Sequence, residues 1–299
     1  MFVLYQSFLK MLSYLYNWIV ARVIRQAASK TYVTHEDEVL HIPSRDAGRT
    51  IKAHLYRNPK TSSQPFPVLL NWHSSGFVIP QHGSDDEFAL KVINSTSHAV
   101  LDVSYRLAPE DPFPAATNDA EDAVKYVLAH PETYDVTRLS VSGFSAGGTL
   151  ALGLCGHVFT PDTFKHVLTF YPPTDLTVEP AHKITPDPEE TSIPNWLAST
   201  FNECYAPSGR MERDHPLISP AKIEASQFPK NALIITCAHD NLAPETEELA
   251  DKMENAGINV TRRRMAHCKH AWDKDYTPGS VQEQAKDEAY AMAVEMLQK

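Results

Sequence analysis

The sequence predicts an α/β fold with a mostly parallel central sheet, helices on both faces and an inserted helical cap. From residue 68 onward, short apolar strands alternate with helical stretches, a pattern typical of parallel sheets covered on both faces. A proline-rich stretch at 172–229 interrupts the alternation and is too long for an ordinary connection. We therefore expect a single domain over residues 1–299, with a cap formed by about 1–40 and by an insertion at about 175–225.

The first 26 residues are predicted to form a helix rich in aromatic and aliphatic side chains. The longest uncharged run after Lys10 is residues 11–21, which is too short to span a bilayer. The stretch also lacks the basic start and the small-residue cleavage site of a secretory signal. Such a helix either packs over the active site as part of a lid or lies on a membrane surface. We favour the lid.

The other elements follow from runs of apolar residues and from the turn residues between them. The predicted strands are 38–42, 51–57, 68–72, 99–104, 139–142, 166–171, 233–237 and 259–264. The predicted helices are 85–97, 117–129, 148–156, 196–205, 244–256 and 281–297. Ligands of such sheets bind beyond the carboxyl ends of the strands. We therefore expect the functional residues in the loops that follow these strands.

Composition and charge exclude some partners. The apolar fraction of 42% and the charged fraction of 21% are ordinary for a globular protein with a full core. A net charge of −10 argues against nucleic acid as a partner, because no basic stripe is present to neutralise phosphates. Four cysteines without a C-x-x-C pair fit a reducing compartment. We expect a cytoplasmic protein, with peripheral membrane contact through the first helix left open.

One stretch carries a recognisable catalytic pattern. Residues 143–147 read Gly-Phe-Ser-Ala-Gly and fit G-x-S-x-G, a sharp strand-to-helix turn that exposes its serine above the sheet. The serine then lies at a helix N-terminus, where backbone amides favour negative charge. Ser145 is therefore a candidate nucleophile, and the alternative is a purely structural turn. A serine hydroxyl needs a histidine base and an orienting carboxylate to become reactive.

Both partners have candidates later in the chain. Asp240 follows the strand at 233–237 and is the candidate acid, although an aspartate there can also start a helix. His267 and His270 both follow the last predicted strand, and their spacing alone does not choose between them. Cys268 between them allows a metal site, but no second cluster supplies further ligands. We therefore predict no metal and no cofactor.

Three further segments extend the pattern to most of the chain. Residues 104–116 read S-Y-R-L-A-P-E-D-P-F-P-A-A, residues 143–148 read G-F-S-A-G-G, and residues 215–220 read H-P-L-I-S-P. Through these segments, the chain from about residue 65 to 298 resembles the hormone-sensitive-lipase-like branch of the α/β-hydrolases. The members of that branch are carboxylesterases and related lipases. The resemblance implies the α/β-hydrolase fold, with the segment at 104–116 in a structural role.

The resemblance also implies a set of site residues. Ser145 would be the nucleophile, Asp240 the acid, and the base a histidine about thirty residues further on, which favours His270 over His267. The amides of two residues in the loop after residue 72, Ser75 and Gly76, would form an oxyanion hole together with the amide of Ala146.

The chain departs from the family pattern at three places. Ser74 and Ser75 stand where the family has glycines, so we expect a narrower or differently turned oxyanion loop. Phe144 replaces the family's aspartate and makes the surroundings of the serine more apolar. Trp272 ends a His-Ala-Trp triplet where the family has His-Gly-Phe, and we expect its indole at the rim of the site, favouring flat substrates.

The predicted function is hydrolysis of a small or medium-sized ester or lactone, such as a specialised metabolite, through an acyl-enzyme. Two alternatives on the same fold are a non-catalytic small-molecule receptor and a transacylase.

Overall fold

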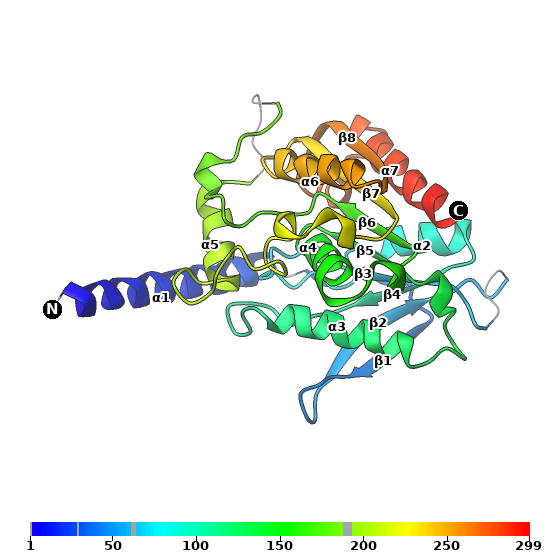
Figure 1. Cartoon of the computed structure of the whole chain (residues 1–299), viewed down its shortest axis with the longest axis horizontal. Helices are drawn as coiled ribbons and strands as arrows, with labels where there is room; N and C mark the ends of the chain where they lie inside the picture. The colour runs from blue at the N-terminus through cyan, green and yellow to red at the C-terminus, as the bar shows by residue number, and fades with distance from the viewer. Residues whose placement is uncertain (1, 29, 61–63, 188–192) are drawn as a thin grey trace.

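The computed structural model describes residues 2–28, 30–60, 64–187 and 193–299 (Figure 1). Among these residues, eight strands form one sheet in the order β1-β2-β4-β3-β5-β6-β7-β8. β2 pairs antiparallel with β1 and with β4, and the other neighbours are parallel. The strands are β1 (Glu38–Pro43), β2 (Thr50–Tyr56), β3 (Val68–Trp72), β4 (Ala99–Val103), β5 (Ser140–Phe144), β6 (His166–Phe170), β7 (Asn231–His239) and β8 (Asn259–Lys269).

Helices cover both faces of the sheet. Successive residues of a strand point to opposite faces, so Leu70 packs into a core shared with α3, α4 and α6, and Leu69 into a second core shared with α2 and α7. The predicted α/β fold with a mostly parallel sheet is therefore confirmed. The helices are α1 (Phe2–Ala28), α2 (Asp86–Ser95), α3 (Ala115–Leu128), α4 (Ala146–Gly153), α5 (Asn195–Tyr205), α6 (Ala243–Asn255) and α7 (Val281–Leu297).

The last strand is longer than predicted. β8 continues to Lys269, so His267 lies within the strand and not in a loop beyond it. β8 pairs with β7 as far as His239, and buried Met265 and Cys268 anchor this extension against the sheet. The loop that was expected to hold both histidines therefore begins only at His270.

The first helix extends away from the sheet and packs against α5, which belongs to the long stretch between β6 and β7 (Figure 1). Thr200 on α5 donates a hydrogen bond to the Asn17 side chain at 3.4 Å. Further along α1, Arg25 donates to the backbone oxygens of Val78 and Ala108. Of the predicted cap, residues 1, 29 and 188–192 lie outside the described residues. None of the described helices combines the length and apolarity needed to cross a membrane.

Candidate active site

Ser145 lies at a strained turn between β5 and α4. Its φ of 49° and ψ of −119° are rare for a residue with a side chain, which is the expected signature of a nucleophile elbow. The flanking glycines are required by close backbone contacts. A Cβ at Gly147 would lie 1.9 Å from the Trp72 carbonyl oxygen, and one at Gly143 would lie 2.2 Å from the backbone of Gly147. The turn therefore brings the serine to the carboxyl edge of the sheet.

Two loops bring the predicted acid and base to this serine. The His270 ring lies between Ser145 and Asp240, with Nε2 at 2.8 Å from Ser145 Oγ and Nδ1 at 2.7 Å from Asp240 Oδ2. Asp240 is buried, and its other carboxylate oxygen accepts a hydrogen bond from the Leu242 amide at 3.1 Å. With Nδ1–H donating to the aspartate, a neutral His270 keeps its Nε2 lone pair for the serine proton.

His270 is held in place by its neighbours as well. Ala271 adopts a left-handed conformation with φ of 58°, at the position where the related family has glycine. The ring of Tyr171 packs edge-on against the His270 ring with centroids 4.8 Å apart. Tyr171 in turn donates a hydrogen bond to Asp273 at 2.6 Å, a contact that the sequence did not reveal because the two residues are far apart in the chain.

The competing histidine lies elsewhere. The His267 side chain is exposed, and its ring is next to the His239 ring at a centroid distance of 6.3 Å. Cys268 between the two candidates is buried, and this burial raises the pKa of its thiol to about 12. The ligand atoms of His267, Cys268 and His270 therefore do not lie close enough together to bind one metal ion.

A second serine–histidine contact has no connection with this site. Ser140 Oγ lies 3.1 Å from His166 Nδ1, where β5 and β6 begin, at the edge of the sheet opposite Ser145. Both residues are buried, and burial lowers the pKa of His166 to about 4, so the ring is neutral. This contact contributes to the packing of the sheet.

The predicted oxyanion loop follows β3. Within the described chain, the amides of Ser75, Gly76 and Ala146 donate to no protein acceptor, so they are available to a ligand. The left-handed backbone angles fall on Gly76 and Phe77, at φ of 55° and 61°. Ser74 and Ser75 therefore lie outside the left-handed region, because the turn is made by the two residues that follow them.

Tyr105 supports this loop. Its hydroxyl donates to the His73 carbonyl oxygen at 2.7 Å and lies 2.7 Å from Ser75 Oγ, which also accepts from the Phe77 amide. The Tyr105 ring stacks on the His73 ring with centroids 4.4 Å apart. Burial lowers the pKa of His73 to about 3, so this stack involves a neutral imidazole. The structural role expected for the segment at 104–116 includes this support.

Phe144, the residue before the nucleophile, is buried between an aromatic ring and a cation, so its surroundings are less apolar than we expected. The Phe144 ring stacks on Phe170 at 4.3 Å, and the ammonium of Lys274 lies 4.0 Å from the centroid of the Phe144 ring. Burial alone would lower the pKa of Lys274, but the nearby carboxylates of Asp273 and Asp85 raise it. The lysine is therefore a cation, held between two carboxylates and an aromatic face.

Two cavities meet at Ser145. One is partly open to solvent and extends over Pro173, Leu176 and Leu242. The other extends over Ile79, Gln81 and His270. Phe201 of α5 lines both cavities, and its ring lies against Gly76. The serine therefore faces two different compartments.

The indole of Trp272 is not at the rim of these cavities, contrary to our expectation. Only 3% of the residue is exposed, and its ring packs against Tyr171 with centroids 5.5 Å apart. The residue begins a short helical turn that points into the core shared with α7. Its indole therefore supports the site from below and does not contact the space around Ser145.

Comparisons with known proteins agree on the family. A family model described as the alpha/beta hydrolase fold matches residues 69–274. Ethyl acetate hydrolase of Pseudomonas putida is 29% identical over 272 residues, which cover 87% of this chain and 81% of that protein. An AB hydrolase superfamily protein of Schizosaccharomyces pombe is 30% identical over 216 residues, 69% of this chain and 63% of its own length. Lipase 2 of a Moraxella species is 26% identical over 249 residues, 72% of this chain. The match spans less than two thirds of these last two proteins, at 63% and 57%.

Solved structures give the same result over nearly the whole chain. EstE1, a thermostable carboxylesterase cloned from a metagenomic library, superimposes with a TM-score of 0.76 at 27% identity, covering 97% of this chain and 98% of its own. An esterase of Pyrobaculum calidifontis gives 0.75 at 25% identity, covering 97% and 93%. With the nucleophile-elbow geometry and the family match over residues 69–274, this chain belongs to the hormone-sensitive-lipase-like branch of the α/β-hydrolases.

Proposed function

We propose that the protein is a serine carboxylic-ester hydrolase that works through an acyl-enzyme. The observation that carries this proposal is the His270 ring, which lies within hydrogen-bond distance of both Ser145 and Asp240. This is the arrangement that makes a serine hydroxyl nucleophilic. Membership of a family of esterases and lipases supports the same reading.

In the proposed reaction, Ser145 attacks the ester carbonyl while His270 takes its proton at Nε2. Asp240 stabilises the imidazolium that results, and the free amides of Ser75, Gly76 and Ala146 stabilise the oxyanion. His270 then gives the proton to the leaving alcohol. Water activated by the same histidine hydrolyses the acyl-enzyme and restores the serine.

The two cavities suggest the class of substrate. Their linings are mainly apolar, with Leu176, Pro180 and Leu242 in the first and Ile79 and Leu197 in the second. One cavity would hold the acyl group and the other the alcohol. A small or medium-sized apolar ester or lactone fits this division, because Phe201 limits the depth available on each side.

The proposal is tested on p-nitrophenyl esters from acetate to palmitate. We expect Ser145→Ala and His270→Ala each to lower kcat by about 10⁴-fold or more, because the triad acts as a unit. His267→Ala serves as the matched control and is expected to keep near-full activity. If no ester is turned over in a Ser145-dependent way, the esterase proposal fails and a receptor role on this fold becomes the better reading. Turnover that rises with added alcohol and gives a new ester would identify a transacylase.

A further inference from the structure

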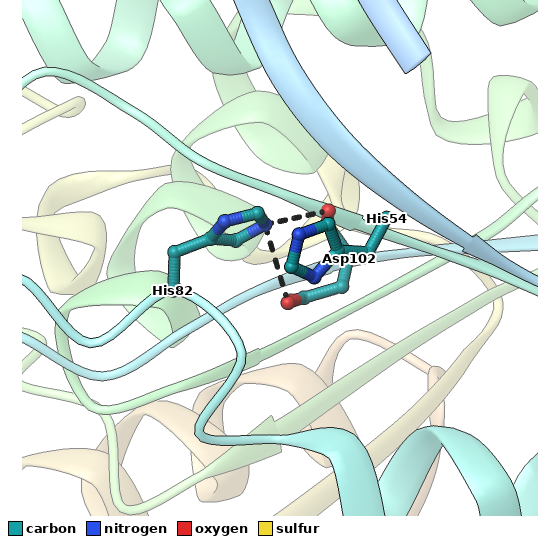
Figure 2. A group of neighbouring side chains, drawn as sticks. All are labelled: His54, His82 and Asp102. Carbon is teal, nitrogen blue, oxygen red and sulfur yellow. Dashed lines mark hydrogen bonds and ion pairs between the residues drawn. The ribbon is translucent and has the colours of Figure 1, made fainter. Parts of the chain in front are cut away.

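Two histidines and an aspartate that the proposed reaction does not use come together beside the oxyanion loop. His54 on β2 and Asp102 on β4 are direct Cα partners across the two antiparallel strands. His82 reaches them from the loop after β3, and Figure 2 shows the three side chains facing one another. One potential ligand atom from each lies within 4.8 Å of the other two. No other such group occurs among the residues that the structure describes.

The cluster contains polar atoms that are buried without hydrogen bonds. His54 is 4% exposed and Asp102 is 1% exposed. Within the described chain, three buried atoms of the cluster have no hydrogen-bond partner. They are both ring nitrogens of His54 and the Oδ2 atom of Asp102. The nearest charged groups are further away: His54 Nε2 is 3.7 Å from Glu36, and Asp102 Oδ2 is 3.4 Å from His82 Nε2. Because unmade hydrogen bonds at buried polar groups are costly, these atoms require an explanation.

The surroundings orient the aspartate as they would a metal ligand. Asn71 donates a hydrogen bond to Asp102 Oδ1 at 2.9 Å and to Asp85 at 2.7 Å. The side-chain oxygen of Asn71 (Oδ1) in turn accepts a hydrogen bond from Ser142 Oγ at 2.8 Å. One carboxylate oxygen is thus fixed from behind while the other faces the histidines. Metal-binding carboxylates are commonly supported in this way.

The chemistry of the three side chains fits an added cation. Imidazole nitrogen and carboxylate oxygen are donors that transition metals take in proteins, and the cluster offers both kinds. A bound cation would also give partners to the buried atoms of His54 and Asp102 that have no hydrogen bond in the described chain.

We propose that His54, His82 and Asp102 form a structural binding site for a divalent transition metal, with Zn²⁺ as the best-fitting ion. Two imidazoles and one carboxylate are a common zinc donor set. Glu36 lies close enough to His54 to supply a fourth ligand. The side chains of His82 and Glu36, at 15% and 18% exposure, provide access from solvent.

Binding requires a small contraction. Ligand atoms around tetrahedral zinc lie about 3.3 Å apart, given bonds of about 2.0–2.1 Å. The cluster is slightly wider than this. His82 would exchange its present contact with the Asp102 carbonyl oxygen, at 3.1 Å, for the metal. Because His82 lies on a loop, it can make this movement more easily than the two strand residues.

The metal would tie the segment after the oxyanion loop to the sheet. His82 follows Gly76 by six residues, and its ring lies 5.9 Å from the ring of His73. Cross-linking this loop to β2 and β4 would hold it down in the folded state. The site does not contact Ser145, so its occupancy stands or falls independently of the esterase proposal.

The test uses the full-length protein after dialysis against a chelator. Co²⁺ is titrated as a spectroscopic substitute for zinc, and Zn²⁺ binding is measured by equilibrium dialysis with elemental analysis. We expect one ion per chain, visible d–d absorption with Co²⁺, and a higher Tm on adding Zn²⁺. His82→Gln and Asp102→Asn are expected to weaken binding by at least about tenfold to a hundredfold, since even the supporting groups of metal sites have effects of that size.

His98→Gln is the matched control. Like His54, His98 is buried, and its ring nitrogens have no hydrogen-bond partner in the described chain, but it lies outside the cluster. It should retain one ion per chain. Circular dichroism of the metal-free variants checks that they are folded, and His82→Gln is the safer of the two because the His82 side chain is 15% exposed, against 2% for Asp102. Absence of stoichiometric binding to the wild type, or equal binding by His82→Gln, would overturn the proposal and leave the cluster as a contact between His82 and Asp102 alone.

Discussion

At the residue scale, Tyr105 connects the oxyanion loop to the rest of the protein. Its hydroxyl contacts both the His73 carbonyl oxygen and Ser75 Oγ. In Tyr105→Phe these two contacts disappear and a buried carbonyl loses its partner, at a cost of about 1–3 kcal/mol in folding. We expect kcat to fall by about tenfold with little change in KM, because the loop acts mainly on the transition state.

The control for this prediction is Tyr134→Phe, another buried tyrosine that packs against Phe66 far from Ser145. It is expected to leave kcat unchanged on p-nitrophenyl butyrate. If Tyr105→Phe also retains full kcat, the tyrosine contributes to stability alone and does not position the oxyanion donors.

At the element scale, α5 divides the space above the nucleophile. Phe201 lines both cavities, and a Cβ added at Gly76 would lie only 2.4 Å from its ring. Phe201→Ala would join the two compartments. We expect the ratio of kcat/KM for octanoate over acetate to rise about tenfold, the scale of one methylene group in an apolar pocket.

Leu197→Ala on the same helix is the matched comparison, because Leu197 lines only the cavity that extends over Ile79 and Gln81. It should change the chain-length preference less than Phe201→Ala does. An unchanged preference in Phe201→Ala would mean that the ring does not form the wall between the acyl and alcohol sides.

The first helix has two different faces. Asn17 contacts α5, the helix whose Phe201 lines both cavities at Ser145. Leu12, Leu15, Tyr16, Ile19 and Val23 recur at helical spacing and are 43–66% exposed. An exposed apolar stripe of this kind binds lipid interfaces. We therefore predict that the protein floats with phosphatidylcholine vesicles and that Leu15→Ser/Ile19→Ser abolishes flotation.

Both substitutions lie on the exposed stripe, so esterase activity in solution should stay unchanged and report an intact lid. If the wild type fails to float, the helix serves the lid alone.

At the scale of the whole molecule, buried neutral histidines limit acid stability. Burial, assisted by Arg138, lowers the pKa of His98 to about 3, and burial lowers that of His166 to about 4. In the unfolded chain both would titrate near 6.5. Below that pH the unfolded state binds more protons than the native state, so stability is full above about pH 6.5 and declines towards pH 4. Burial raises the pKa of Asp102 to about 6, so below that pH its protonation favours the folded state and partly offsets the loss of stability caused by the histidines.

We expect each of the two histidines to cost about 2 kcal/mol of stability at pH 5, from the difference between the folded and unfolded pKa values. His98→Gln should therefore flatten the decline of the urea midpoint between pH 7 and 5 relative to the wild type. If the urea midpoints of the two proteins fall in parallel between pH 7 and 5, His98 has the same pKa in the folded and unfolded states, which would contradict the prediction.

Much of this architecture could be predicted from local pattern. The strand at 68–72 and the helix at 281–297 match β3 and α7, because apolar runs and turn residues report burial directly. The contacts of Ser145 and Asp240 with a histidine could be anticipated from the order of three loops at one sheet edge, and the choice of His270 over His267 came from the family resemblance. The cluster at His54, His82 and Asp102 could not, because its members approach only through the pairing of β2 with β4.

The errors have a physical origin as well. Trp272 was expected at the rim, yet the left-handed turn at Ala271 directs it into the core, and sequence does not reveal that angle at an alanine. The oxyanion loop was expected to be narrower or differently turned at its two serines, and its left-handed backbone angles lie at the next two residues, Gly76 and Phe77. In both cases a single backbone turn decided where the side chains point.

The most direct test of the central claim is covalent labelling of the nucleophile. The protein is incubated with diethyl p-nitrophenyl phosphate, which transfers its phosphoryl group to activated serines, and is analysed by intact and peptide mass spectrometry. We predict one adduct per chain on Ser145, formed far more slowly in His270→Ala and at the wild-type rate in His267→Ala. No adduct on the wild type, or an adduct on another residue with Ser145 unmodified, would contradict the account.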